Sequence, residues 1–250
     1  MRFDPSPHLL GRRLDLLLAE QLLARGPHQE AMFRYRRARD DRWMQGLMAL
    51  RGVEATSLDL SCALTRRPGR FGRDADEAQL IRGLRRAIDR IDESVELARP
   101  LDAEELGHLH AVTTATVEGE YPGVLRTAAP LDPVPGLEPP SAELLRVLLE
   151  RFSRRLDLHD GAGSWGNLHP IDQAATLFRR LVLLAPFHDH NLIVACLATS
   201  WWLMARGYPP FLPRSADRRR LLADLAGSDA ELSRRIARIV FRGFLDLRAG

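Results

Sequence analysis

The sequence predicts an all-helical fold. Apolar residues recur three and four positions apart along most of the chain, and the sustained alternation of apolar and polar residues that strands need is almost absent. Of the 250 residues, 45% are apolar and 28% are charged, which allows a chain of this length to bury a core within one or two domains. This composition excludes a collagen, a long disordered chain and a disulfide scaffold.

The net charge argues against a dedicated nucleic-acid-binding domain, and the cysteines indicate a reducing compartment. All 36 basic residues are arginines, and 33 acidic residues nearly cancel them, so the net charge of +3 falls short of a dedicated nucleic-acid-binding domain. Cys62 and Cys196 stand among apolar neighbours, which predicts two buried thiols. The N-terminus lacks the residue order of a signal peptide, and the apolar run 192–205 is shorter than the ~20 residues that cross a bilayer. We therefore expect a cytoplasmic protein with no membrane partner.

In the first half of the chain, the apolar spacing predicts helices over 9–25, 30–50, 76–98 and 102–116. The first helix ends at Gly26-Pro27 and the third at Pro100, because glycine and proline interrupt helices. A basic loop that contains proline and glycine occupies 66–73.

The second half begins with one long irregular stretch, 118–140, which is rich in proline. A compact domain seldom keeps so long a loop without a use for it. Helices are predicted over 141–156, 215–226 and 229–247, and a glycine-rich break lies at 160–167. Ser228 and Glu231 form a capping box that begins the last helix.

The clearest local feature is a pair of helices joined by a short polar turn. The first helix begins at His169-Pro170 and ends before Pro186. The second is apolar, runs over 191–206 and is followed by Gly207, which we expect in a left-handed conformation. The N-terminus of the second helix presents unpaired N–H groups and a positive dipole, which favours a phosphate ligand, although the turn has none of the glycines that usually allow close approach.

Three segments resemble a known family. HPIDQAATLFRRLVLLAPFHDHNLIVACLATSWWLMARGYPPFLP looks like the central helix pair of Fic (Fido-fold) proteins, whose loop normally reads HPFxDGNGRxxR. LGHLHAVTTATVEGEYPGVLRTAAP is similar to the family's helix and flap, with its PGxxR pattern at Pro122, Gly123 and Arg126. VEATSLDLSCAL is similar to the region of the family's inhibitory glutamate, which Glu54 would represent. The resemblance implies a Fic-like helical bundle with a short flap that could form a small β-hairpin.

Active Fic enzymes transfer a nucleotide monophosphate, usually AMP from ATP, to a protein hydroxyl with the help of a divalent metal. The resemblance implies that the loop histidine takes the proton, the acidic residue holds the metal and the Gly-Asn-Gly-Arg part cradles the phosphates. The corresponding loop here consists of Ala185, Pro186, Phe187, His188, Asp189, His190 and Asn191. Ala185 stands where the catalytic histidine belongs, and two glycines and two arginines are replaced by His190, Leu192, Ile193 and Cys196.

We therefore expect a degenerate Fic-like protein that does not transfer AMP. Loss of a positioned base typically removes ~10²- to 10⁴-fold in rate, and each lost contact to developing charge costs a comparable factor. The resemblance assigns no catalytic residue and leaves Asp189 and Asn191 as the cofactor-binding residues, with weak affinity for ATP and with Asp189 as the ligand of Mg²⁺. The chain would act as a protein- or nucleotide-binding module.

The two histidines of the turn allow three interpretations. His188 or His190 could replace the missing base, although each is three or more positions from Ala185. Both could chelate a metal with Asp189 or His169, without the usual ligand spacing. We prefer the third interpretation, in which both histidines cap or hydrogen-bond the start of the second helix.

The flap keeps more of its family meaning. Pro122-Gly123 predicts a turn, and Arg126 could hold an anion or fix the flap, while an extended flap edge could accept a strand of a protein partner. An ordinary surface turn with an exposed arginine is the alternative. Glu54 lacks the expected neighbours and its arginine partner, so we expect it to pair with another arginine or to be exposed.

The C-terminal helix pair supports a second function class, a DNA-binding regulator. Its arginines include Arg218, Arg219, Arg220, Arg234, Arg235 and Arg238. A third hypothesis is a repurposed nucleotidyl or phosphoryl transferase. The Trp201-Trp202 tandem suggests one ring in the core and another toward a neighbouring helix or an interface, and we favour core packing. A homodimer is a further expected partner state. We divide the chain into an N-terminal helical region packed on the core (1–100), a Fic-like core (101–213) and C-terminal helices of the same domain (214–250).

Overall fold

The computed structural model describes residues 12–16, 29–67, 69–72, 75–117, 121–157 and 167–248. These residues form helices and connecting loops, and no strand occurs among them, so the all-helical prediction is confirmed. In chain order the elements are α2 (Gln29–Leu50), α3 (Ser57–Leu64), α4 (Asp76–Glu96), α5 (Ala103–Thr114), α6 (Ala142–Asp157), α7 (Pro170–Leu184), α8 (Asn191–Met204), the short 3₁₀ helix η1 (Ser215–Asp217), α9 (Arg218–Ala226) and α10 (Asp229–Arg248).

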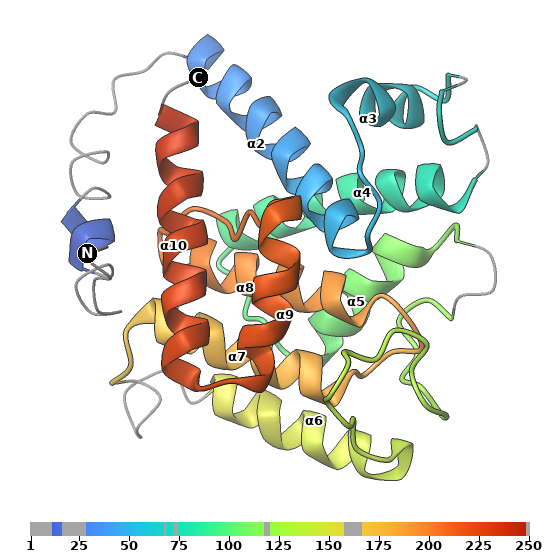
Figure 1. The fold of residues 1–250 in the computed structure, drawn as a ribbon, viewed down its shortest axis with the longest axis vertical. Coiled ribbons are helices and arrows are strands. Elements are labelled where there is room, and N and C mark those ends of the chain that lie inside the picture. The colour runs from blue at the N-terminus through green and yellow to red at the C-terminus, as the bar shows by residue number, and fades with distance from the viewer. Residues whose placement is uncertain are drawn as a thin grey trace.

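Helix α8 is the centre of the bundle. Its sequence is apolar around its whole circumference, and a helix of that kind is stable only when neighbours cover every side. Helices α2, α4, α5 and α7 supply those neighbours, and α10 packs on α7 (Figure 1). Every residue of α8 from Ile193 to Leu203 is buried, including Trp201 and Trp202. Both rings are thus packed in the core, which was the favoured prediction for the tandem.

One hydrophobic core links the parts of the chain. It contains Trp43 of α2, Ile88 of α4, Leu177 of α7 and Ile236 of α10, each of which has no exposed surface. The N-terminal and C-terminal helices thus pack on the same core as the central pair. The boundaries near residues 100 and 213 stay predictions.

The helix ends follow the chemistry of their sequences. Ser228 and Glu231 exchange the two hydrogen bonds of a capping box, and Gly207 adopts φ 79°, as predicted. Helix α3 was not predicted from the sequence. It has 8 residues, too few for a periodic pattern, and Thr56 caps it with Asp59 in a second capping box.

The remaining predictions concern the two cysteines, the helix over 9–25 and membrane spans. Cys62 is only half-buried, because it lies near the exposed C-terminal end of α3, whereas Cys196 is fully buried. Only 12–16 of the helix predicted over 9–25 lies within the described residues, and it is helical there. None of the helices in the described ranges is long and apolar enough to cross a membrane.

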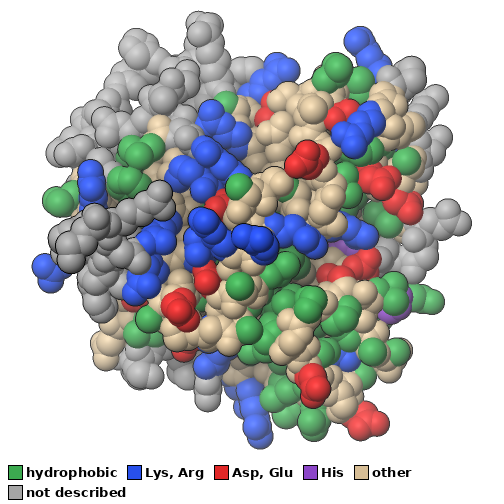
Figure 2. All heavy atoms as spheres, viewed as in Figure 1, with side chains coloured by type: hydrophobic (Ala, Val, Ile, Leu, Met, Phe, Trp, Pro, Cys, Tyr) green, Lys and Arg blue, Asp and Glu red, His purple; other side chains and the backbone are tan. Residues whose placement is uncertain are grey.

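Two kinds of side chain gather on the face that carries α9 and α10. Figure 2 shows a band of arginines across the middle of this face. Hydrophobic side chains gather toward its lower right, where Figure 1 places the loop segment 121–141.

Candidate functional site

The polar turn between α7 and α8 is built on two residues in the left-handed region. Ala185 has φ 40° and His190 has φ 64°. Ala185 leaves the helical region because Pro186 follows it, and its N–H still donates to the carbonyl of Leu181 at 3.0 Å. A left-handed conformation costs a residue with a side chain roughly 1–2 kcal/mol, so the contacts of this turn must hold it in place.

Asn191 closes the turn. Its Oδ1 accepts from the backbone N–H of Phe187 at 2.8 Å, and its Nδ2 donates to the carbonyl of Phe187 at 2.9 Å. The buried amide thus ties the start of the turn to the first residue of α8. Asn191 therefore uses its side chain to hold the turn of the chain itself.

The N-terminus of α8 is occupied by a carboxylate of the protein. Asp132, from the segment 121–141, accepts from the backbone N–H of Asn191 at 2.9 Å and from its Nδ2 at 2.8 Å. A negative charge at this position is stabilised by the unpaired N–H groups and the helix dipole. Burial nevertheless raises the pKa of Asp132 to about 6, against the effect of the two hydrogen bonds from Asn191.

Asp189 and His190 are held by Arg51 at the end of α2. The Arg51 Nη1 lies 2.6 Å and 3.0 Å from the two ring nitrogens of His190 and 3.4 Å from Oδ2 of Asp189. A guanidinium only donates, so the ring nitrogen that receives it is an acceptor. Burial would raise the pKa of Asp189, but hydrogen bonds from His190 and the charge of Arg51 outweigh it and lower that pKa to about 2.

Arg126 fixes the segment 121–141 to the turn. Its side chain is 6% exposed and donates to the carbonyls of Ala185 at 2.7 Å, Ala128 at 2.9 Å and Pro140 at 2.6 Å. Its own N–H donates to the carbonyl of Pro186 at 3.0 Å. No carboxylate of the described residues pairs with it, and burial lowers its pKa. Of the two roles predicted for Arg126, holding an anion and fixing the flap, the structure shows the second.

Pro122 and Gly123 form the predicted turn. The N–H of Val124 donates to the carbonyl of Tyr121 at 3.1 Å, and Gly123 has φ 75°, which favours glycine at the third position of such a turn. Over 121–141 the described flap has no strand, so the small β-hairpin is not formed there. Prolines at several positions of this segment lack the N–H that a ladder needs.

His110 of α5 supports the turn from beneath, and the sequence analysis missed it. It is fully buried, its ring stacks on Phe187 with centroids 4.1 Å apart, and its Nδ1 accepts from the N–H of Gly123 at 3.0 Å. Burial lowers its pKa to about 4. The available signal was its place on the apolar face of the helix over 102–116, between Leu106 and Thr113.

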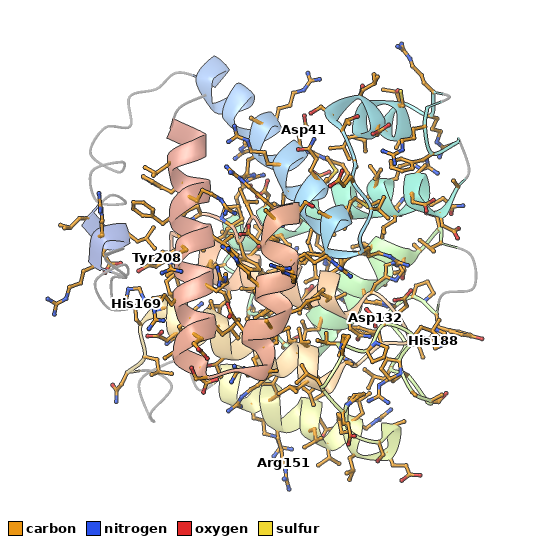
Figure 3. All side chains as sticks on the ribbon, viewed as in Figure 1. Asp41, Asp132, Arg151, His169, His188 and Tyr208 are labelled. Atoms are coloured by element: carbon orange, nitrogen blue, oxygen red, sulfur yellow. The ribbon has the colours of Figure 1, made fainter. Side chains whose placement is uncertain are left out.

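His190 is the N-cap residue of α8, but its side chain makes no capping bond, so the predicted side-chain cap is wrong for this histidine. Its backbone carbonyl accepts from the N–H of Val194 at 3.0 Å, and the N–H of Asn191 donates to Asp132. The ring of His188 contacts the ring of Tyr121 edge-on. The backbone carbonyl of His188 accepts from the N–H of Leu131 at 2.7 Å. Figure 3 places His188 farther out than Asp132. His169 lies at the opposite end of α7, and the described residues contain no metal-binding group of three side chains.

A cavity of about 250 Å³ remains over the start of α8, below the roughly 300–1,000 Å³ of common ligand pockets. Its charged and polar lining consists of Arg51, Arg218, Asp132, Asp189 and His190. Leu192 and Ile193 extend the apolar part of its wall. The cavity thus brings two cations and two carboxylates of the chain together.

Glu54 and the C-terminal arginines complete the predicted residues. Glu54 is exposed, and its Oε1 accepts from the Ser215 hydroxyl at 3.3 Å rather than from an arginine of the described residues. On α10, Arg235 pairs with Asp224 at 2.7 Å, and Arg242 pairs with Asp217. Arg218, Arg219 and Arg220 are exposed on α9. DNA binding through this helix pair stays a prediction.

No family model matches the chain. It is 27% identical over 204 residues to the "Protein adenylyltransferase Fic" of Drosophila ananassae. The aligned region covers 80% of this chain and 40% of that protein. The protein of the same name from Drosophila mojavensis is 28% identical over 207 residues, covering 82% and 40%. The chain therefore spans about two fifths of the length of these curated relatives.

The fold is similar to solved structures. Fic-1 from C. elegans superposes with a TM-score of 0.82 at 19% identity, over 97% of this chain and 72% of that one. A Fic domain containing signaling protein from Bacteroides thetaiotaomicron superposes with a TM-score of 0.77 at 17% identity, over 96% and 97%. At such identities these structures establish the shared fold.

Proposed function

Because this chain belongs to the Fic family, we propose that it is a Fic-like protein that does not transfer AMP and that works by binding a protein partner through the segment 121–141. The observation that carries the proposal is the carboxylate of Asp132 on the N-terminus of α8. That helix end is where the family resemblance places the phosphates. In this chain an internal anion takes the same N–H group.

The turn also lacks a group that could act as the base. The methyl group of Ala185, at the position of the family's histidine, cannot accept a proton. His190 is engaged by Arg51, and His188 faces Tyr121. Loss of a positioned base lowers a rate by roughly 10²- to 10⁴-fold, which supports an inactive turn.

The carboxylate that would bind the metal is also engaged by groups of the protein. Asp189 would have to hold Mg²⁺, but its carboxylate already accepts from the N–H of His190 at 2.7 Å and lies 3.4 Å from Arg51. A divalent cation would meet the charge of Arg51 at this distance. Leu192 and Ile193 offer no cation for a phosphate. The donor set therefore does not fit a nucleotide with Mg²⁺, and the proposal favours a protein partner over a nucleotide.

The segment 121–141 has the properties of a docking surface. Arg126 holds it firmly on the core, while Tyr121, Val124 and Leu131 are 63%, 55% and 67% exposed. The segment lies toward the part of the face where Figure 2 shows hydrophobic side chains gathered. Exposed apolar groups on a rigid support mark interaction sites in many proteins.

Catalysis is tested with ATP labelled on its α-phosphate, in the presence of Mg²⁺ or Mn²⁺ and a cell extract. We expect no incorporation of label by the wild type, and none by Ala185→His alone, because Asp132 and Arg51 still occupy the turn. Incorporation by the wild type that Asp189→Ala abolishes would refute the proposal and establish a repurposed transferase.

Docking is tested by comparing the proteins that the purified chain retains with those retained by variants. We expect a partner that is lost with Leu131→Asp and with Val124→Asp. Leu97→Asp is the matched control, because Leu97 is 58% exposed at the end of α4, outside the segment 121–141. A partner set that responds equally to all three changes would contradict docking at this segment.

A further inference from the structure

Helix α6 carries more apolar side chains than its contacts with the rest of the bundle require. Leu145, Leu149 and Phe152 are buried and mark the side of α6 that faces α5 and α7. Leu144 and Val147 are 57% and 48% exposed. A helix that packs on one side needs an apolar stripe of only roughly 100°. The exposed pair therefore lies outside the stripe that the fold of this chain uses.

Val147 lies on the side of α6 that points away from the bundle. Each residue of an α-helix is rotated by about 100° from the one before it, so two positions place Val147 nearly opposite Leu145 and Leu149. Glu143 and Arg151, four positions before and after Val147, lie on the same side as Val147. Both are exposed, and Figure 3 shows Arg151 pointing away from the rest of the molecule.

The two charges beside Val147 are not used within the described part of the chain. Neither Glu143 nor Arg151 forms a hydrogen bond or an ion pair with a described residue. They are eight positions apart, about 12 Å along the helix axis, which is too far for them to pair with each other. Glu150 and Arg154, only four positions apart on the same helix, do pair at 3.9 Å. The outer side of α6 thus has an apolar centre with a carboxylate before it and a guanidinium after it.

A second copy of α6 in the antiparallel orientation complements this pattern. In a two-fold symmetric pair the same surface serves on both copies, so each contact occurs twice. With the axis at Val147, the two valine side chains meet, and each Glu143 lies opposite Arg151 of the partner subunit. A parallel pair would instead bring carboxylate against carboxylate and guanidinium against guanidinium, which is unfavourable. The charges therefore select the antiparallel arrangement.

We propose that α6 is a self-association surface through which two copies of this chain form an antiparallel, two-fold symmetric dimer. Leu144 and Val147 of both copies supply its apolar centre, and two pairs between Glu143 and Arg151 set its orientation. A single pair of helices buries less than the roughly 1,200–2,000 Å² of a standard interface, so the association is weak and depends on protein concentration. The proposal does not depend on the proposed function, because none of these residues lies in 121–141.

The test is sedimentation equilibrium of the full chain over a wide range of protein concentrations. We expect the wild type to pass from monomer to dimer, and Val147→Asp to associate about tenfold more weakly, because it places two carboxylates at the axis. Glu143→Arg and Arg151→Glu should each weaken association about tenfold, since each turns two pairs of opposite charge into two pairs of like charge. Leu58→Asp is the matched control and should associate as the wild type does, because Leu58 is 72% exposed on α3.

A mixture of the two charge variants tests the orientation. Glu143→Arg mixed with an equal amount of Arg151→Glu should associate about as strongly as the wild type, because each reversed charge then meets its opposite. The proposal is overturned if the wild type stays monomeric at every concentration, or if the mixture associates as weakly as its components do alone. Loss of association with Val124→Asp or Leu131→Asp, but not with Val147→Asp, would also overturn it and would place the contact on the segment 121–141.

Discussion

Asp132 should make the folded protein less stable as the pH rises from 4 to 7, and replacing it with asparagine should remove that trend. In the folded state burial raises the pKa of this carboxyl to about 6, above its ordinary value of 3.8. The folded protein then binds the proton more tightly than the unfolded chain does. The stabilisation is fully present below the unfolded pKa and is lost as the pH passes through the folded pKa.

The size of the effect follows from the difference between the two pKa values. About two pKa units, at 1.36 kcal/mol each, give a loss of at most about 3 kcal/mol between pH 4 and pH 7. Asparagine keeps an oxygen that can accept from the N–H of Asn191 and carries no charge at any pH. The unfolding free energy of Asp132→Asn should therefore lack the pH trend of the wild type, although one hydrogen bond is lost because the new NH₂ group faces the Nδ2 donor of Asn191.

The assay is urea unfolding of the wild type and Asp132→Asn at each pH from 4 to 8. His110 titrates in part of the same window with the opposite sign, because its pKa falls to about 4 from 6.5. Its contribution is the same in both proteins and cancels in the difference. A difference in unfolding free energy that stays constant with pH would refute the position assigned to Asp132.

Three further changes probe the turn and the packing. Arg126→Met removes donors from several carbonyls and should cost about 3 kcal/mol or more, with faster amide exchange over 121–141; unchanged exchange would contradict the fixing role. His190→Gly relieves about 1 kcal/mol of left-handed strain, and the pKa of Asp189, followed by NMR, should rise from about 2 toward 3.8 because a donor is lost. An unmoved pKa would show that the other contacts suffice. Gly83→Ala would place a Cβ 1.8 Å from the carbonyl oxygen of Thr113, and should cost at least about 1–3 kcal/mol by forcing α4 and α5 apart. A melting temperature equal to that of the wild type would exclude this close contact.

The positions of the long helices could be predicted because their signals are local. Proline follows the C-terminal ends of α4 and α7 within a few residues, and the apolar spacing continues along each helix. Helix α3 escaped because 8 residues give too little periodicity. The resemblance of the turn to the Fic loop likewise rests on neighbouring residues, which a sequence shows directly.

The partners of the turn could not be predicted, because they come from distant parts of the chain. Asp132 lies 59 positions from Asn191, and Arg51 lies 139 positions from His190. Nothing in the local sequence shows that a carboxylate reaches a helix end or that a guanidinium takes a ring nitrogen. The length of the loop over 118–140 and its PGxxR pattern were the signals that this segment has a role.

The attachment of the segment 121–141 has a consequence for how this protein can change. Arg126 donates hydrogen bonds to backbone carbonyl oxygens, which every residue possesses. These bonds therefore do not depend on which side chains the segment carries. Mutations at the outward positions Val124 and Leu131 can therefore accumulate without loosening the anchorage. The segment can acquire new specificities while its scaffold stays constant, much as hypervariable loops do on an antibody.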